Sequence, residues 1–150
     1  MHDRSSVTST VIRYATAADA LALSALLSQL GYPSPPESLP GRLERLAANA
    51  GAAALVAVRN DRIVGLATMH IITPINRERD VAWLTTLVVD EAARGTGVGR
   101  ALVEAVEARA RDAGCERLSV TTHENRSQAH EFYARIGFER TGRRFGMTLV

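Results

Sequence analysis

The feature that most restricts the fold of this chain is a strand-like run that leads through a glycine-rich turn into a long amphipathic helix. Residues 81–89 end in the apolar Leu87-Val88-Val89, and glycines then stand at alternate positions 95, 97 and 99. Apolar residues recur at helical spacing over about residues 97–113, and Gly114 ends that pattern. A strand followed by a turn and a helix predicts a β-α-β crossover, which requires a sheet with helices packed on its faces.

The rest of the chain predicts an α+β (α/β layered) domain with a mixed central sheet and helices on both faces. Thr16 is a candidate cap for a first helix that Gly31 ends, with Asp19 in its first turn. Arg59-Asn60-Asp61-Arg62 has the composition of a hairpin turn. The expected order is β-α-α-β-β-β-α-β-α-β-β, with strands at 11–14, 53–59, 63–72, 81–89, 117–122, 138–141 and 145–150 and later helices near 39–49, 97–113 and 127–136.

Length and composition favour one domain over residues 11–150, after a flexible N-terminal lead-in at 1–10. The single Cys115 excludes an internal disulfide, and no base or cleft near it in the sequence favours a nucleophilic role. The four histidines lack zinc-like spacing, so no metal is expected. No apolar run is long enough for a membrane span, and no apolar stretch follows the charged N-terminus as in a secretory signal. We therefore expect a cytoplasmic protein without a membrane partner.

All 18 basic residues other than histidine are arginines, and the formal net charge is +2. The lack of lysine excludes Schiff-base and P-loop lysine chemistry. The mild excess of positive charge argues against a strongly basic nucleic-acid arm, although it permits a local arginine site for a phosphorylated small molecule.

The glycine-rich turn is a candidate anion site, because the first amides of a helix lack partners and carry partial positive charge. Arg94 and Arg100 flank it. The alternative is a tight connection in which the glycines serve only the backbone. A dinucleotide-binding fingerprint requires glycine at its sixth position, where this chain has Arg100, and a Walker loop requires a lysine, which this chain lacks. Neither nucleotide-binding motif therefore fits this turn.

The pattern Arg94-x-x-Gly97-x-Gly99 resembles the acyl-CoA pyrophosphate loop of the GNAT superfamily of N-acyltransferases. A second stretch, Asn125-Arg126-Ser127-Gln128-Ala129-His130-Glu131-Phe132-Tyr133 followed by Ile136-Gly137-Phe138, is similar to the second signature of that family. The two signatures occur in the family order, and the expected element order matches the family fold over nearly the whole chain.

The resemblance implies that acetyl-CoA lies in a gap beside the 81–89 strand. Its pantetheine would contact the backbone of Leu87, Val88 and Val89 and the side chain of Asn125, which is alternatively a helix cap. Arg126 and Arg135 are candidates for the adenosine end. The remaining implied cofactor contacts are Arg94, Gly95, Thr96, Gly97, Val98, Gly99, Arg100, Ala129 and Tyr133.

The resemblance also implies catalytic roles. Tyr133 is the candidate general acid for the leaving thiolate, since a phenol keeps its proton at neutral pH; alternatively it is a core aromatic. An amide of Leu87 or Val88 would stabilise the oxyanion. Thr85 and Thr86 stand where relatives often carry an acid, so the candidate bases are His70, His123 and Glu124, or a water path.

The predicted function is direct transfer of an acetyl group from acetyl-CoA to a primary amine of a small molecule or peptide. Residues 32–40 and 73–80 would form the walls of the acceptor site. A non-catalytic acyl-CoA sensor of the same fold is the alternative, and a nucleic-acid partner is not expected. The resemblance further implies a bacterial enzyme and a homodimer formed through C-terminal strands.

Overall fold

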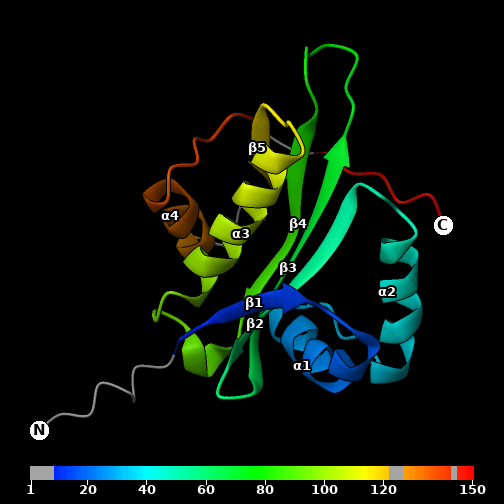
Figure 1. Ribbon diagram of the computed structural model, residues 1–150, viewed down its shortest axis with the longest axis vertical. Helices are drawn as coiled ribbons and strands as arrows, with labels where there is room; N and C mark the ends of the chain where they lie inside the picture. Colours follow the sequence, from blue (N-terminus) through cyan, green and yellow to red (C-terminus); the bar gives the residue numbers. More distant parts are fainter. Residues whose placement is uncertain (1–8, 122–126, 143–144) are drawn as a thin grey trace, which may run out of the picture. The chain divides into compact units, whose positions relative to one another are not determined.

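The computed structural model in Figure 1 describes residues 9–121, 127–142 and 145–150. The chain divides into two compact units, Met1–Ser119 and Val120–Val150. Among the described residues no helix combines the length and the apolar character that a membrane span needs.

A five-stranded sheet in the order β1-β2-β3-β4-β5 forms the frame of the fold. The four strands β1 to β4 pair with antiparallel neighbours. Strand β5 follows β4 through a helix, which is the connection that a parallel pair requires, so the sheet is mixed as predicted. The strands are β1 (Val11–Tyr14), β2 (Ala52–Arg59), β3 (Arg62–Ile72), β4 (Val81–Val89) and β5 (Arg117–Val120).

The hairpin between β2 and β3 is the predicted one. Arg59 and Arg62 are register partners, and the two residues between them both have positive φ, 50° at Asn60 and 61° at Asp61. That pair of left-handed residues is the signature of a type I′ turn, whose twist matches the twist of the flanking strands. The hairpin fixes the position of the Arg59 side chain at the end of the sheet.

Helices cover both faces of the sheet, and Figure 1 shows α1 and α2 on one side and α3 on the other. Their bounds are α1 (Ala20–Leu30), α2 (Leu39–Ala47) and α3 (Val98–Asp112), with short 3-10 turns at η2 (Ala17–Asp19), η3 (Pro36–Ser38) and η4 (Glu91–Ala93). Gly31 ends α1 with a φ of 98°, as its position in the sequence predicted. The core beneath α1 and α2 consists of Leu23, Leu26, Leu39, Val56, Leu66 and Val88.

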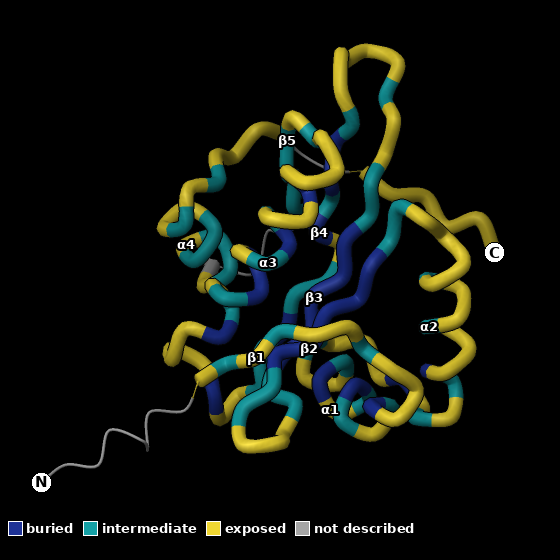
Figure 2. Tube along the Cα trace, viewed as in Figure 1, coloured by how far each residue is buried: buried dark blue, intermediate teal, exposed yellow. Residues whose placement is uncertain are grey.

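The other face of the sheet is buried by α3. The helical spacing of apolar residues predicted this stripe, and its members Val98, Leu102, Val103, Val106 and Ala110 are all buried. Figure 2 shows the central strands as the most buried part of the chain. Gly65 of β3 lies directly under this helix. A Cβ there would lie 2.8 Å from Leu102 Cδ1 and 3.0 Å from Val98 Cγ1, so the close approach of α3 requires glycine.

An ion pair between the partly exposed Arg13 and the buried Asp19 joins β1 to the start of the first helix. The Arg13 guanidinium donates to both carboxylate oxygens of Asp19 at 2.8 and 2.9 Å, and Asp19 is only 6% exposed. The same carboxylate accepts the backbone N–H of Thr16 at 2.7 Å. Asp19 therefore satisfies the helix start as predicted, and it also ties the helix to the sheet.

The unit Val120–Val150 contains the helix α4 (Ser127–Arg135). The closing strands predicted at 138–141 and 145–150 are wrong, because none of residues 138–142 and 145–150 is in a strand. Alternating apolar residues form a strand only when a neighbouring strand pairs with their backbone. Here the apolar side chains of Phe145, Met147 and Leu149 are instead exposed.

Candidate functional site

The turn between β4 and α3 has a backbone that only glycine adopts readily. Gly95 and Gly97 have φ values of 75° and 94°, in the left-handed region. Nothing lies within 4 Å of the place where a Cβ would stand at either glycine, and residues 94–97 are exposed. The turn therefore presents its backbone to solvent at the end of a central strand.

The N-terminus of α3 gives this turn the character of an anion site. Gly97 is the N-cap of the 15-residue helix, so the amides of Val98, Gly99 and Arg100 belong to its first, unpaired turn. The arginines on either side are exposed, although each has one partner: Arg94 Nε donates to Val89 O at 3.2 Å, and Arg100 Nε lies 3.3 Å from Glu104 Oε1. Free amides, a positive helix end and two cations match the chemistry of a pyrophosphate.

A glutamine that the sequence did not single out holds the start of this turn. Gln29 of α1 donates from Nε2 to Asp90 Oδ1 at 2.8 Å and accepts the Glu91 N–H at 2.9 Å. These partners are 61 and 62 residues away in the chain, so no local pattern could reveal them. The contact attaches the end of β4 to the helix layer on the other side of the sheet.

A β-bulge interrupts β4 just before Leu87-Val88-Val89. Thr68 pairs with Thr86 and Met69 pairs with Leu84, which leaves Thr85 as the extra residue. Strand β5 has four residues and begins beside the start of β4, where Glu116 N–H donates to Asp80 O at 2.9 Å. A parallel strand that short cannot reach the last three residues of β4, so no strand among the described residues borders that edge.

The bulge brings three polar side chains together on the α1/α2 face of the sheet. Thr85 Oγ1 lies 2.8 Å from Thr68 Oγ1 and 3.1 Å from His70 Nδ1, and it donates to Thr68 O at 3.2 Å. The sequence predicted His70 as a candidate base and noted Thr85 without a role for it. Thr68 was missed, because only the register of β3 against β4 places it beside the bulge.

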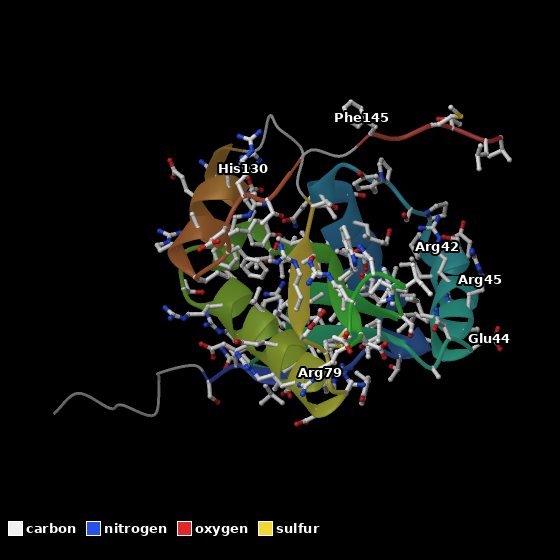
Figure 3. All side chains as sticks on the ribbon, turned by 90° about the horizontal axis from the view of Figure 1, so that it is seen from above. Arg42, Glu44, Arg45, Arg79, His130 and Phe145 are labelled. Carbon is white, nitrogen blue, oxygen red and sulfur yellow. The ribbon has the colours of Figure 1, made fainter. Side chains whose placement is uncertain are left out.

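The proline-rich connection between α1 and α2 is fixed by Ser34, which is buried. Its hydroxyl accepts from Arg42 Nη1 at 2.8 Å and donates to Tyr32 O at 2.9 Å, while Ser24 Oγ donates to Ser34 O at 2.6 Å. Figure 3 shows Arg42 and Arg45 along α2. The first of the two predicted acceptor walls is therefore an ordered segment.

The second predicted wall, residues 73–80, borders a shallow cavity of about 440 Å³. It is lined by Ile75, Asn76, Arg77, Glu78 and Glu116. Arg77 Nη1 and Glu116 Oε1 are 3.4 Å apart across it.

In the second unit, Tyr133 of α4 is half-buried between two phenylalanines. Its ring meets Phe132 and Phe138 edge-on, with centroids 5.4 and 5.5 Å apart. Ala129 is half-buried on the same helix, and Arg135 is exposed in its last turn. The predicted residues His123, Glu124, Asn125 and Arg126 lie outside the described residues.

Cys115 is half-buried after the end of α3. Burial and, to a smaller extent, the negative charge of Asp80 raise the pKa of its thiol. A raised pKa opposes the thiolate form that a nucleophile needs.

Comparison with known proteins agrees with this geometry. The model of the Acetyltransferase (GNAT) family matches residues 21–138. An aminoglycoside N(6')-acetyltransferase type 1 from Stenotrophomonas maltophilia is 36% identical over 135 residues, which cover 88% of each chain. An aminoalkylphosphonate N-acetyltransferase from Salmonella typhimurium is 32% identical over 94 residues, 63% of this chain and 61% of that protein.

Among solved structures, a transcriptional regulator from Bacillus halodurans superposes with a TM-score of 0.86 at 25% identity, over 94% of this chain and all of that one. The matched family region includes both the glycine-rich turn and α4. The chain therefore belongs to the GNAT family of acetyltransferases and is an acyl-CoA-dependent enzyme that transfers an acetyl group to an amine.

Proposed function

We propose that this N-acetyltransferase moves the acetyl group of acetyl-CoA directly to a primary amine of a small polar molecule. The observation that carries the proposal is the exposed glycine turn, which joins a helix N-terminus to a bulged strand whose last residues no described strand borders. Acetyl-CoA would supply an acyl group already activated as a thioester. The side chains and backbone of this chain would bind the cofactor, stabilise the oxyanion and transfer the protons.

The proposed cofactor contacts are assigned from the hydrogen-bond donors and acceptors that each part of the site offers. The amides of residues 95–100, with Arg94 and Arg100, would hold the pyrophosphate. The unbordered edge of Leu87, Val88 and Val89 would hold the pantetheine through backbone hydrogen bonds, and an amide of Leu87 or Val88 would stabilise the oxyanion. Asn125, Arg126, Ala129 and Arg135 remain predicted contacts.

His70 is the base that the hydrogen-bond geometry favours. The Thr85 hydroxyl has one hydrogen and lies within hydrogen-bond distance of Thr68 Oγ1, His70 Nδ1 and Thr68 O. In the proposed arrangement that hydrogen goes to Thr68 O, and His70 donates from Nδ1 to the Thr85 oxygen, which leaves a lone pair on Nε2. Nε2 would take the proton of the incoming amine. His123, Glu124 and a water path remain alternative bases.

Tyr133 is the proposed general acid, since a phenol has a proton to give to a leaving thiolate at neutral pH. Its edge-on contacts with Phe132 and Phe138 hold the ring in one orientation, which a proton donor requires. The same contacts would suit a purely structural aromatic, so the phenol oxygen is the group to test.

The acceptor is proposed to be a small molecule, with aminoglycosides as the first class to test. The support is the relative from Stenotrophomonas maltophilia, whose match covers 88% of both chains. The ordered segment at 32–40 and the cavity beside 73–80 would form the walls of this site. Aminoalkylphosphonates are the second class, on the weaker match.

The test is release of the CoA thiol in the presence of acetyl-CoA and a panel of amines. Tyr133→Phe and His70→Gln should each lower kcat by about 10²-fold, within the range typical of one acid or base, while CoA affinity stays unchanged. Tyr14→Phe is the matched control, because it removes a phenol oxygen that contacts Arg109. Unchanged turnover in both variants would exclude these catalytic roles.

A second proposed role is acyl-CoA sensing, and its support is the similarity to a solved structure named as a transcriptional regulator. Binding of CoA without acetyl transfer to any amine of the panel would favour this role over the proposed transfer to a small amine.

A homodimer and a cytoplasmic location also remain proposals. The exposed apolar side chains of Phe145, Met147 and Leu149 support association through the C-terminal segment. Light scattering of the full chain and of a Phe145→Ser variant would show whether that segment joins two copies.

A further inference from the structure

Arg59, at the end of β2, contacts the glycine turn with two of its nitrogens. Nη1 donates to Thr96 Oγ1 at 2.7 Å, and Nη2 donates to Thr96 O at 2.8 Å. Its third nitrogen, Nε, donates to Thr10 Oγ1 at 2.7 Å. One planar guanidinium thus holds both the side chain and the backbone of a single residue, 37 positions away in the chain.

Thr96 lies in the part of the turn where the backbone is least restricted by its own residues. It stands between Gly95 and Gly97, which both have positive φ and no side chain to restrict them. Its hydroxyl donates back to Ala93 O and accepts from Arg59, so Oγ1 joins the turn to β2. Among the hydrogen bonds of the described residues at this turn, the bond from Arg59 is the one that the Thr96 carbonyl accepts.

The contact also determines where the next amide points. In a planar trans peptide the C=O and the following N–H point in opposite directions. Because Thr96 O faces Arg59, the N–H of Gly97 faces away from Arg59. That amide belongs to the set proposed above to hold the pyrophosphate.

We propose that Arg59 is a positioning residue that orients the Thr96–Gly97 peptide for phosphate binding. This inference rests on the proposed use of acetyl-CoA. In this proposal Arg59 acts through Thr96, since each of its three nitrogens already donates one hydrogen to Thr10 or Thr96. Lysine cannot replace it, because an ammonium on a flexible stem lacks the planar fork that reaches two acceptors at once.

The experiment compares Arg59→Ala, Arg59→Lys and Arg62→Ala with the wild type. Arg62 is the matched control, because it is the exposed register partner of Arg59 across the same hairpin and its loss removes the same charge. Calorimetry with CoA gives the dissociation constant. Steady-state kinetics give KM for acetyl-CoA, kcat and KM for the amine, and thermal unfolding reports whether each variant is folded.

Arg59→Ala should weaken CoA binding by about tenfold, equivalent to 1.4 kcal/mol, with an equal rise in KM for acetyl-CoA. The variant kcat and the KM for the amine should stay within about twofold of wild type, and Arg59→Lys should not restore affinity. Arg62→Ala should bind CoA like the wild type. A merely structural role would lower stability without this selective change in KM.

Three results would overturn the inference. Wild-type affinity in Arg59→Ala would exclude the positioning role and leave the proposed function intact. An equal loss in Arg62→Ala would assign the effect to charge alone. A wild-type chain that binds no CoA would overturn the proposed function and, with it, this inference.

Discussion

At the residue scale, the carboxylate of Asp19 is subject to two opposing effects. Hydrogen bonds from the Arg13 guanidinium hold its pKa below the ordinary value, and the Thr16 N–H acts in the same direction, although burial acts to raise it. A carboxylate whose pKa is lower in the folded state stabilises the fold above its unfolded pKa, and this contribution is lost as pH falls through the folded pKa.

Asp19→Asn should therefore lower the free energy of unfolding by about 2 kcal/mol at pH 7, since it replaces charged hydrogen bonds with neutral ones in a buried place. The difference between variant and wild type should begin to shrink near pH 4, the ordinary pKa of an unfolded aspartate, and should be lost as pH falls through the lower pKa of the folded carboxyl. Urea titrations of both proteins at pH 7 and pH 3 measure it. A difference that does not change with pH would show that the charge of Asp19 contributes nothing.

Contacts between distant residues were harder to predict than single candidate residues. The sequence predicted His70 and the turn glycines, because an imidazole can act as a base and glycine allows a left-handed backbone whatever its neighbours are. Thr68 and Gln29 carry no such signal. Their roles depend on a one-residue bulge and on contacts across more than 60 positions, and neither follows from local spacing.

At the scale of elements, the close packing of α3 on β3 can be tested by substituting two glycines. Gly65 lies under α3, where an added Cβ would come within 3.0 Å of buried side chains, whereas Gly41 lies in α2 with nothing within 4 Å. Gly65→Ala should destabilise the protein by about 1–3 kcal/mol through overpacking. Gly41→Ala should stabilise it by about 0.5 kcal/mol through helix propensity.

Gly65→Ala should also raise KM for acetyl-CoA, since Val98, which its Cβ would touch, is the first residue of α3 after the glycine turn. Chemical unfolding and steady-state kinetics of the two variants provide the comparison. If both substitutions changed stability in the same direction, the close packing of α3 on β3 would not be the cause.

The strands and helices from residue 11 to residue 120 were largely predictable, with several ends exact and the others within three residues. Strong alternation, Gly31, Gly114 and the residues of the type I′ turn each set a boundary by local physics. The two closing strands were predicted wrongly. An alternating pattern indicates which face of a strand could be buried, but it does not show whether a neighbouring strand is present to pair with it.

At the scale of the whole molecule, ligand binding should be visible as stability. CoA at 100 times its dissociation constant should add about 2.7 kcal/mol, which corresponds to a rise in Tm of about 5–10 °C for a domain of this size. Gly97→Ala should reduce that rise, because alanine disfavours the left-handed φ of 94° that the turn requires. Differential scanning calorimetry with and without CoA is the measurement, and an equal rise in both proteins would exclude this turn from the binding site.

Polar contacts between different segments of this protein are repeatedly made by guanidinium groups: Arg13 with Asp19, Arg42 with Ser34, Arg59 with Thr96 and Arg109 with Tyr14. A guanidinium stays protonated and is a poor nucleophile, unlike the amine of lysine. An enzyme that handles an activated thioester exposes its own surface to chemical acylation. In this chain no side chain offers an amine for that reaction, so the ties that hold the fold and the turn together are resistant to modification by the enzyme's own substrate.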